Sequence, residues 1–396
     1  MSSPRVLIVN AWHDDNKGDA AITLGAVLEA RRRWPDCHVT VAGLLNPLPE
    51  GAFRHVAAGS GGSVTTVGSL VPALAVDASP LATGLWALKI SGVAALSKIG
   101  WSPRRLTAAL RDTDTVILCG GSNLFTSGRR SVFGSLRLVQ LLLPARVAAR
   151  RRIDVRAWGH SLGPFARRRD CRLLGSVLSG CSEVWLRESA SLDALERCGV
   201  DRSCALVRRD LAFELTPDDS ERVQRLITGL GRFVAVAPRT HPYSDPASET
   251  RLVGELARWS RELLDRGLVD NVAVVAQTLG PTEVEDDRPV ARRLAEAIGE
   301  HARLIEEDLS PMELSALYGH SCGTVGVRLH AAILALNGGA PAFAISYFSP
   351  KTPGVMELEG LGGCWADYAE VTADDLRRWY DEEDSLKRDA SASLTE

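Results

Sequence analysis

Positive charge excess, long apolar runs and a leader-like start are all missing from this 396-residue sequence. The net charge is −3, so no overall positive charge is present to neutralise nucleic-acid phosphates, and we expect no nucleic-acid partner. No uninterrupted apolar run reaches the roughly 18 residues of a membrane-spanning helix, so we expect no transmembrane segment. The first apolar run, 6–9, is too short for a secretory signal sequence and is typical of a strand.

Paired cysteines and metal-ligand motifs are also absent. The eight cysteines are scattered without a C-x-x-C pair, which predicts reduced cysteines in a cytoplasmic protein. Neither H-x-x-H nor H-E-x-x-H occurs, so the sequence calls for no metal. Asp286 and Asp287 resemble a metal pair, but they open a predicted helix, where acidic side chains favour the helix dipole.

Short apolar runs alternate with helical patterns, which indicates α/β domains whose parallel sheets are covered on both faces. A first series of predicted strands comprises 6–10, 38–43, 63–68, 115–119, 153–158, 183–186 and 205–208. A second series comprises 233–237, 272–276, 302–305, 323–327 and 342–346. Two such doubly wound domains leave a cleft between them, and clefts between domains are favoured ligand sites.

The two series predict an N-terminal domain over 1–212 and a C-terminal domain over 213–384, with a disordered tail over 385–396. The segment 216–219, T-P-D-D, predicts a helix start because a threonine cap precedes proline and acidic residues. The segment 310–313, S-P-M-E, has the spacing of a capping box.

The most apolar stretch belongs to a helical insertion over about 70–110. Asp77, Pro80 and Lys89 interrupt the apolar pattern there. We expect a buried helical hairpin, and the alternative is an interfacial helix that touches a lipid-borne substrate.

A polar loop follows the first predicted strand, at the edge where open α/β sheets bind ligands. Gly18 permits a tight turn, and Asp19 begins a helix whose free N–H groups attract anions or sugar hydroxyls. The alternative is that Asn16 and Asp19 serve only as turn and cap residues. The loop lacks G-x-G-x-x-G, so a dinucleotide site is poorly supported.

Two further polar loops are predicted after strands 115–119 and 153–158. In the first loop, paired glycines permit close approach to a ligand, or they form a plain turn. In the second loop, G-H-S-L-G is similar to a nucleophile elbow, but Pro164 falls where the elbow's helix would begin. The polar-loop residues are Gly120, Gly121, Ser122, Asn123, His160 and Ser161.

Cationic side chains follow further predicted strands. Arg187 follows 183–186, Arg239 follows 233–237, and Arg328 and His330 follow 323–327. Guanidinium forks match phosphate or carboxylate, and imidazole exchanges a proton near neutral pH. These residues predict a site for an anionic small molecule; the alternatives are solvated arginines and a histidine that caps its own helix.

Lys351 lies beyond the last predicted strand and offers a point charge for phosphate, or else it is a solvated lysine. The remaining histidines of interest are lesser candidates: His13, His160 and His241.

Together these motifs resemble the polysaccharide pyruvyl transferase family, in order over roughly 6–361. The matching motifs are N-K-G-D-A-A-I at 16–22, C-G-G-S-N-L at 119–124, G-H-S-L-G-P-F at 159–165, L-R-E-S-A-S at 186–191, D-L-A-F at 210–213, A-P-R at 237–239, L-S-P-M-E-L at 309–314, V-R-L-H-A at 327–331 and I-S-Y-F-S-P-K at 345–351. Three residues depart from the family's usual pattern, since Ser122 replaces a glycine, His160 a glutamine and Glu188 an aspartate.

The resemblance implies two Rossmann-like domains facing a cleft, as in GT-B glycosyltransferases. It implies a transferase of polysaccharide biosynthesis that moves the carboxyvinyl-derived unit of phosphoenolpyruvate to sugar hydroxyls, giving a pyruvate ketal and phosphate. Phosphoenolpyruvate is then a co-substrate, and we expect no cofactor. His330 would protonate the donor, Asp19 or Asn16 would address the acceptor, and the cations would bind the donor: Arg187, Arg239, Arg328 and Lys351.

Two alternatives stay open: a GT-B-type glycosyltransferase that uses a nucleotide sugar, and a non-catalytic relative that binds a sugar or anion. The expected partners are a small-molecule donor and a saccharide acceptor, with peripheral contact to a lipid-linked acceptor. The acceptor, the linkage, the ketal stereochemistry and the oligomeric state are not specified by these motifs.

Overall fold

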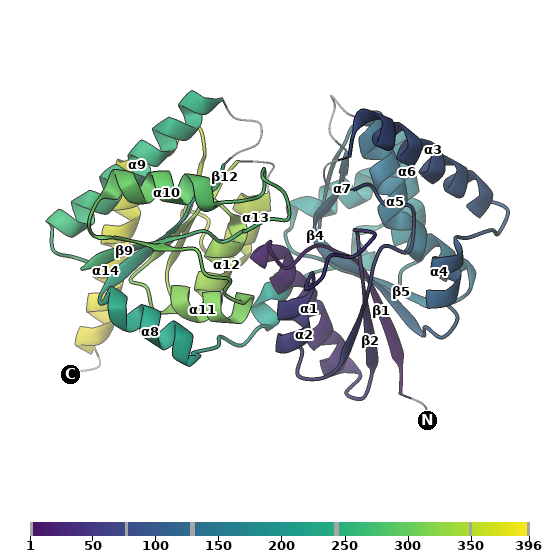
Figure 1. Ribbon diagram of the computed structural model, residues 1–396, viewed down its shortest axis with the longest axis horizontal. Coiled ribbons are helices and arrows are strands. Elements are labelled where there is room, and N and C mark those ends of the chain that lie inside the picture. Colours follow the sequence, from purple (N-terminus) through teal and green to yellow (C-terminus); the bar gives the residue numbers. More distant parts are fainter. Residues whose placement is uncertain (1–2, 76–77, 127–130, 241–244, 348–350, 394–396) are drawn as a thin grey trace. The chain divides into compact units, whose positions relative to one another are not determined.

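The computed structural model describes residues 3–75, 78–126, 131–240, 245–347 and 351–393, and it divides into two α/β units (Figure 1). The first unit comprises Met1–Asp14 and Asp19–Glu214, and the second comprises Asp15–Gly18 and Leu215–Glu396. The short segment Asp15–Gly18 therefore packs with the C-terminal unit, which the sequence did not indicate. The predicted cleft stays a prediction.

The first unit contains a parallel sheet in the order β3-β2-β1-β4-β5-β6-β7. Its strands are β1 (Arg5–Ala11), β2 (His38–Gly43), β3 (Val64–Val67), β4 (Thr115–Thr126), β5 (Asp154–Phe165), β6 (Glu183–Leu186) and β7 (Ala205–Val207). The chain moves outward from β1 to β3 and then returns to β4 on the other side of β1. Ligands of open α/β sheets bind at the carboxyl ends of two such strands, here β1 and β4.

The second unit repeats this plan with the order β10-β9-β8-β11-β12-β13. Its strands are β8 (Phe233–Ala237), β9 (Asn271–Val275), β10 (Ala302–Ile305), β11 (Thr324–Gly326), β12 (Ala342–Ser346) and β13 (Trp365–Asp367). The strand order reverses between β8 and β11. The α/β class and the two parallel sheets are thus confirmed, and only the short strand β13 was not predicted.

Helices connect the strands in both units. Those of the first unit are α1 (Lys17–Arg33), α2 (Arg54–Gly59), α3 (Pro80–Ser97), α4 (Arg104–Ala109), α5 (Ser131–Arg150), α6 (Arg168–Leu178) and α7 (Ala190–Arg197), with the first residues of α1 grouped in the second unit. Those of the second unit are α8 (Glu221–Leu230), α9 (Pro246–Asp265), α10 (Arg288–Ile298), α11 (Pro311–Gly319), α12 (Leu329–Asn337), α13 (Lys351–Leu358) and α14 (Ala373–Ser393).

One of the two predicted helix starts is confirmed and the other is wrong. Ser310 caps α11, and its partner Glu313 completes the capping box, as predicted. The start predicted at 216–219 is wrong, because α8 begins at Glu221 with Ser220 accepting the hydrogen bond from Val223. The expected tail is also different, since α14 continues to Ser393 and residues 394–396 lie outside the described ranges.

Continuous apolar strands supply the core of each sheet. All five residues of β8, F-V-A-V-A, are buried, as a strand covered by helices on both faces requires. The covering helices turn one apolar side inward; in α10 that side consists of Val290, Ala291, Leu294 and Ile298.

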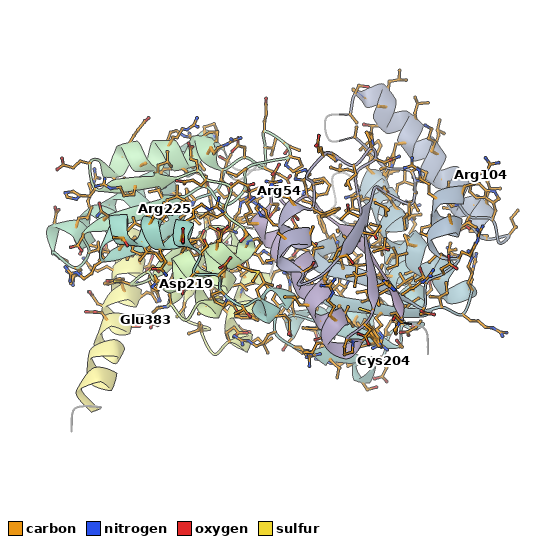
Figure 2. All side chains as sticks on the ribbon, turned by 60° about the horizontal axis from the view of Figure 1, so that its bottom comes forward. Arg54, Arg104, Cys204, Asp219, Arg225 and Glu383 are labelled. Atoms are coloured by element: carbon orange, nitrogen blue, oxygen red, sulfur yellow. The ribbon has the colours of Figure 1, made fainter. Side chains whose placement is uncertain are left out.

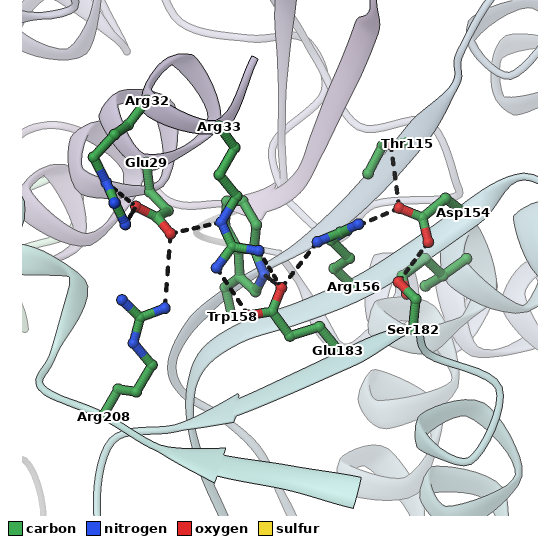
Figure 3. A network of polar contacts seen from close by, with 11 residues as sticks. Glu29, Arg32, Arg33, Thr115, Asp154, Arg156, Trp158, Ser182, Glu183 and Arg208 are labelled. Atoms are coloured by element: carbon green, nitrogen blue, oxygen red, sulfur yellow. Dashed lines mark hydrogen bonds and ion pairs between the residues drawn. The ribbon is translucent and has the colours of Figure 1, made fainter.

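An ion-pair network ties together the amino ends of strands in the first unit (Figure 3). Glu29 of α1 accepts hydrogen bonds from Arg32 and Arg33. Arg33 also donates to Glu183 at the start of β6, and Glu183 accepts from Trp158 at 3.1 Å. Because this network lies at the opposite edge from the strands' carboxyl ends, we assign it to stability.

The insertion after β3 is helical, as predicted, but it is not buried. Helices α3 and α4 form it, and most of α3 faces solvent. By length and composition alone, two described helices are apolar enough to cross a membrane, namely α3 and the part of α5 over Val132–Arg150. Of these windows, 56% of the α5 residues are buried but only 22% of the α3 residues, so α5 is explained as a core helix and α3 is not.

Candidate active site

Each unit gathers predicted site residues at the carboxyl edge of its own sheet. In the first unit they surround Arg187, directly after β6. In the second unit they follow β8, β11 and β12, the strands at and beside the reversal of strand order. The two clusters are described separately.

The Arg187 side chain is 1% exposed and is surrounded by oxygen acceptors. Its Nε donates to Ser161 Oγ at 2.7 Å, and one terminal nitrogen donates to Asp210 at 2.7 Å. The other terminal nitrogen donates to Ser122 Oγ. Donor binding by Arg187 stays a prediction, but these contacts already use all three nitrogens to join the end of β6 to β4, to β5 and to the segment after β7.

The three departures from the family pattern all lie around this arginine. Ser122 accepts from Arg187, and Glu188 accepts from Ser161 at 2.8 Å and from Ser191. His160, 1% exposed, lies close enough that the Arg187 charge helps to lower its pKa. The substitutions therefore fall within one buried cluster rather than at separate places.

Burial is the main reason that the pKa of His160 falls from its ordinary 6.5 to about 4, and the Arg187 charge adds to it. The Nε2 atom lies 3.2 Å from the Leu118 carbonyl oxygen, to which a neutral ring donates. His160 is consequently neutral near pH 7 and is poorly suited to act as a general acid there.

The two loops predicted after strands 115–119 and 153–158 are strands in the structure. The polar segment 120–123 lies within β4, and His160 and Ser161 lie within β5. A Cβ atom at Gly120 would come within 2.4 Å of the Gly159 carbonyl oxygen, so this glycine permits close pairing of the strands. The prediction of turns or ligand-approach loops is corrected for these residues, because the sheet continues through them.

The nucleophile-elbow alternative for Ser161 also fails on this geometry. An elbow places its serine on a sharp turn between a strand and a helix, whereas Ser161 is buried inside β5 and bound to Arg187 and Glu188.

Gly121 marks the point where β4 faces the start of α1. Its φ of +103° is one that glycine adopts readily, and a Cβ atom there would lie 3.9 Å from Asp19 Oδ1. Asn123 is half-buried further along the same strand. Asp19 is half-buried, and it lies at the reversal of strand order between β1 and β4.

The segment Asp15–Gly18 is held against the second unit by several contacts. The Asp15 carbonyl oxygen accepts from Leu279 at 3.0 Å, and Asn16 forms a bridge with Thr278. Lys17, 1% exposed, pairs with Asp308. Asn16 Oδ1 also accepts from the Gly18 amide at 3.2 Å, a local bond typical of a turn residue.

Gly18 lies directly against the candidate acid. A Cβ atom at this position would stand 2.5 Å from Nδ1 and 2.7 Å from Cγ of His330, so any side chain would collide with the imidazole. His330 is half-buried in the first turn of α12, directly after Arg328. Two residues 312 positions apart in the sequence, both proposed from motifs, are therefore brought together.

Arg328 is 6% exposed and forms a bidentate pair with Asp287, with N–O distances of 2.5 and 2.8 Å. It also donates to the Glu285 carbonyl oxygen at 2.8 Å. Burial raises the pKa of Asp287, while the charges of Arg328 and Arg239 oppose that rise. The sequence assigned Asp287 only to a helix start and missed this pairing, for which no local signal exists.

Arg239 and Lys351 complete the cluster of the second unit. The Arg239 guanidinium lies 4.5 Å from the centre of the Tyr347 ring, within cation–π distance. Lys351 begins α13 and is buried, which excludes the solvated-lysine alternative. We name the residues that follow β8, β11 and β12 the basic cluster: Arg239, Arg328, His330 and Lys351.

Two other histidines were predicted as lesser candidates, His13 and His241. His13 is buried in the first unit, and His241 lies outside the described residues. Within the described ranges, no group of three or more His, Cys, Asp or Glu side chains is arranged to hold a metal ion.

Comparison with known proteins identifies the family. The model of the polysaccharide pyruvyl transferase family matches residues 16–350. The amylovoran biosynthesis protein AmsJ of Erwinia amylovora is 28% identical over 269 residues, which cover 65% of this chain and 62% of AmsJ. The matched region thus spans less than two-thirds of that relative.

Solved structures show the same architecture. The putative UDP-N-acetylglucosamine 2-epimerase of Listeria monocytogenes superposes with a TM-score of 0.59 at 11% identity, covering 98% of this chain and 89% of that one. Anabaena Alr3699/HepE in complex with UDP gives 0.55 at 14% identity, covering 98% and 90%. Likeness at these identities shows the fold alone, which is GT-B-like as predicted. Because the family model matches most of the chain, residues 16–350, this chain belongs to the polysaccharide pyruvyl transferase family.

Proposed function

We propose that this protein transfers the carboxyvinyl-derived unit of phosphoenolpyruvate to two hydroxyls of a saccharide, forming a pyruvate ketal and releasing phosphate. The observation that carries the proposal is the basic cluster at the strand reversal of the second sheet, with His330 against Gly18. Family membership supports the same reaction class. The proposal includes a cytoplasmic location and no cofactor besides the co-substrate.

The donor carries a phosphate and a carboxylate, so its site needs several positive groups. In this proposal Arg239 and Lys351 bind the two anionic groups, because they follow β8 and β12, the strands on either side of β11. The amino end of α12 adds its N–H groups, since its cap residue Arg328 makes no side-chain capping bond. Arg328 acts mainly as a positioning residue that fixes Asp287 and the start of α12.

The proposed reaction consists of an addition followed by a displacement of phosphate. His330 gives a proton to the donor's methylene carbon, which becomes a methyl group, and the neighbouring carbon gains oxocarbenium character. The first sugar hydroxyl forms a C–O bond to that carbon and loses its proton. The second hydroxyl then forms another C–O bond as the bond to the phosphate oxygen breaks, so phosphate leaves and the second hydroxyl proton is released.

Asp19 is the proposed base that accepts a hydroxyl proton. It is half-buried beside Gly121 of β4, in the first turn of α1, the helix that follows β1. The acceptor residues proposed around it are Asn16, Gly18, Gly120, Gly121 and Asn123. Because Ser122, His160 and Ser161 lie in or beside the buried Arg187 cluster, we propose that they shape this edge of the sheet rather than touch the acceptor.

The test is incubation of the protein with phosphoenolpyruvate and a panel of saccharides, with phosphate release and product mass measured together. We expect both signals with one acceptor, and His330→Ala should lower kcat by about 10²–10⁴-fold. His320→Ala is the matched control, since His320 is exposed in the same unit and pairs with Asp219.

Three outcomes would count against the proposal. Unchanged turnover in His330→Ala would remove the acid. Nucleotide release from a UDP-sugar, without phosphate release, would identify the glycosyltransferase alternative. Binding of phosphoenolpyruvate without turnover on any acceptor would identify the non-catalytic alternative.

A further inference from the structure

Helix α3 exposes a continuous apolar stripe to solvent. The exposed fractions are 75% for Leu81, 72% for Leu88 and 81% for Ile99, just beyond the helix end. Large exposed apolar patches on a protein surface mark interaction sites. The stripe consists of residues three or four positions apart, hence on one side of the helix: Leu81, Leu85, Leu88, Gly92, Leu96 and Ile99.

The opposite side of α3 is committed to the protein. Trp86, Ile90 and Val93 are buried there, and the helix packs beside α5 (Figure 1). Trp86 Nε1 donates to the Pro72 carbonyl oxygen at 3.1 Å, and Arg150 of α5 donates to the Ser97 carbonyl oxygen. The helix is therefore anchored on one side, so its outer stripe is presented rigidly.

The charged side chains of residues 78–110, which include the stripe, are all basic. Residues 78–110 contain no aspartate or glutamate, in a chain whose net charge is −3. Their basic residues are all exposed: Lys89, Lys98, Arg104 and Arg105. Helical geometry puts Lys89 and Lys98 on the two flanks of the stripe, and Arg104 projects from the start of α4 (Figure 2).

An apolar stripe with flanking lysines fits one partner. Apolar side chains enter the boundary between headgroups and acyl chains, while lysine stems extend to anionic headgroups. Trp101, exposed beyond the helix end, adds a side chain suited to the same boundary. We propose that α3 docks the protein peripherally on an anionic lipid bilayer, with the helix axis along the membrane surface.

This docking does not depend on the reaction proposed above. It would bring the protein to a saccharide acceptor carried on a lipid, and only that consequence rests on the proposed function. The experiments below use vesicles without any acceptor or donor, so failure of docking and failure of the transfer reaction are distinguishable.

The test is flotation of the full-length protein with vesicles of phosphatidylcholine alone or mixed with phosphatidylglycerol. We expect flotation with the mixed vesicles, little with phosphatidylcholine alone, and release by added salt because the charge contribution is screened. The double variant Leu81→Glu/Leu88→Glu should lower partitioning roughly tenfold or more. Lys89→Glu/Lys98→Glu should reduce binding to the mixed vesicles and leave the little binding to phosphatidylcholine vesicles unchanged.

Leu206→Glu/Leu304→Glu is the matched control, because it adds the same two charges at exposed leucines on β7 and β10. It should float like the unchanged protein. Thermal unfolding of each variant verifies the fold, which exposed positions should leave intact.

Absence of flotation with the mixed vesicles would overturn the proposal. So would a dimer in light scattering that the leucine variants dissociate while vesicle binding is absent, since a second copy would then cover the stripe. Binding that resists alkaline carbonate would overturn peripheral docking in favour of a spanning segment.

Discussion

Acid should destabilise the protein through His160, and replacing that residue should remove this part of the pH dependence. The imidazole is 1% exposed, and burial lowers its pKa to about 4 from an ordinary 6.5. In the unfolded chain the ring binds a proton as the pH falls through about 6.5, whereas the folded protein resists protonation until about pH 4. Stability is therefore fully present above pH 6.5 and declines below it.

The size of the effect follows from the gap of about 2.5 pH units between the two pKa values. At about 1.4 kcal/mol for each unit, full titration would remove about 3 kcal/mol of the free energy of unfolding. Between pH 7.5 and 4.5 the expected loss is about 2–3 kcal/mol, a large part of a typical domain's stability.

The assay is urea unfolding of the unchanged protein and of His160→Gln at several pH values over this range. Glutamine does not titrate and keeps a side-chain N–H donor for the Leu118 carbonyl. Other titrating groups are common to both proteins, so the difference between their free energies of unfolding isolates His160. Between pH 7.5 and 4.5 the unchanged protein should lose about 2–3 kcal/mol more of its free energy of unfolding than His160→Gln does. A difference that stays constant with pH would refute our account of the buried neutral imidazole.

Two further substitutions test the second unit. Gly18→Ala should displace the His330 ring and lower kcat by about 10²-fold, whereas Gly254→Ala on α9, where a Cβ atom meets nothing within 4 Å, should leave kcat unchanged in the same phosphate-release assay. Asp287→Asn should cost about 3 kcal/mol in chemical unfolding because it leaves the Arg328 charge buried without its carboxylate. Adding Arg328→Met to that variant should restore much of the loss, and no recovery would argue against a dominant ion pair.

The structure changes how the arginines at strand ends are understood. The sequence places Arg187 and Arg328 at strand ends correctly, but both have buried carboxylate partners, Asp210 and Asp287. An arginine already paired in this way orients its neighbours more readily than it receives a substrate. The proposal therefore treats Arg328 mainly as a positioning residue.

The two parallel sheets, most strand positions and the placement of His330 beyond β11 could be predicted from the amino-acid sequence alone. These features are local: a short apolar run needs burial on both faces, and a cap or a polar residue after a strand acts within a few positions along the chain. The ordered motifs also sufficed to indicate the family, which the matched model over 16–350 confirms.

Contacts between residues far apart in the sequence could not be predicted and became visible in the fold. The Arg328–Asp287 pair, the contact of Gly18 with His330 and the close packing of Gly120 on β5 depend on strand order and on backbone distances. The exposed side of α3 was likewise hidden in the sequence, because an apolar helix looks the same whether the fold covers both of its faces or one.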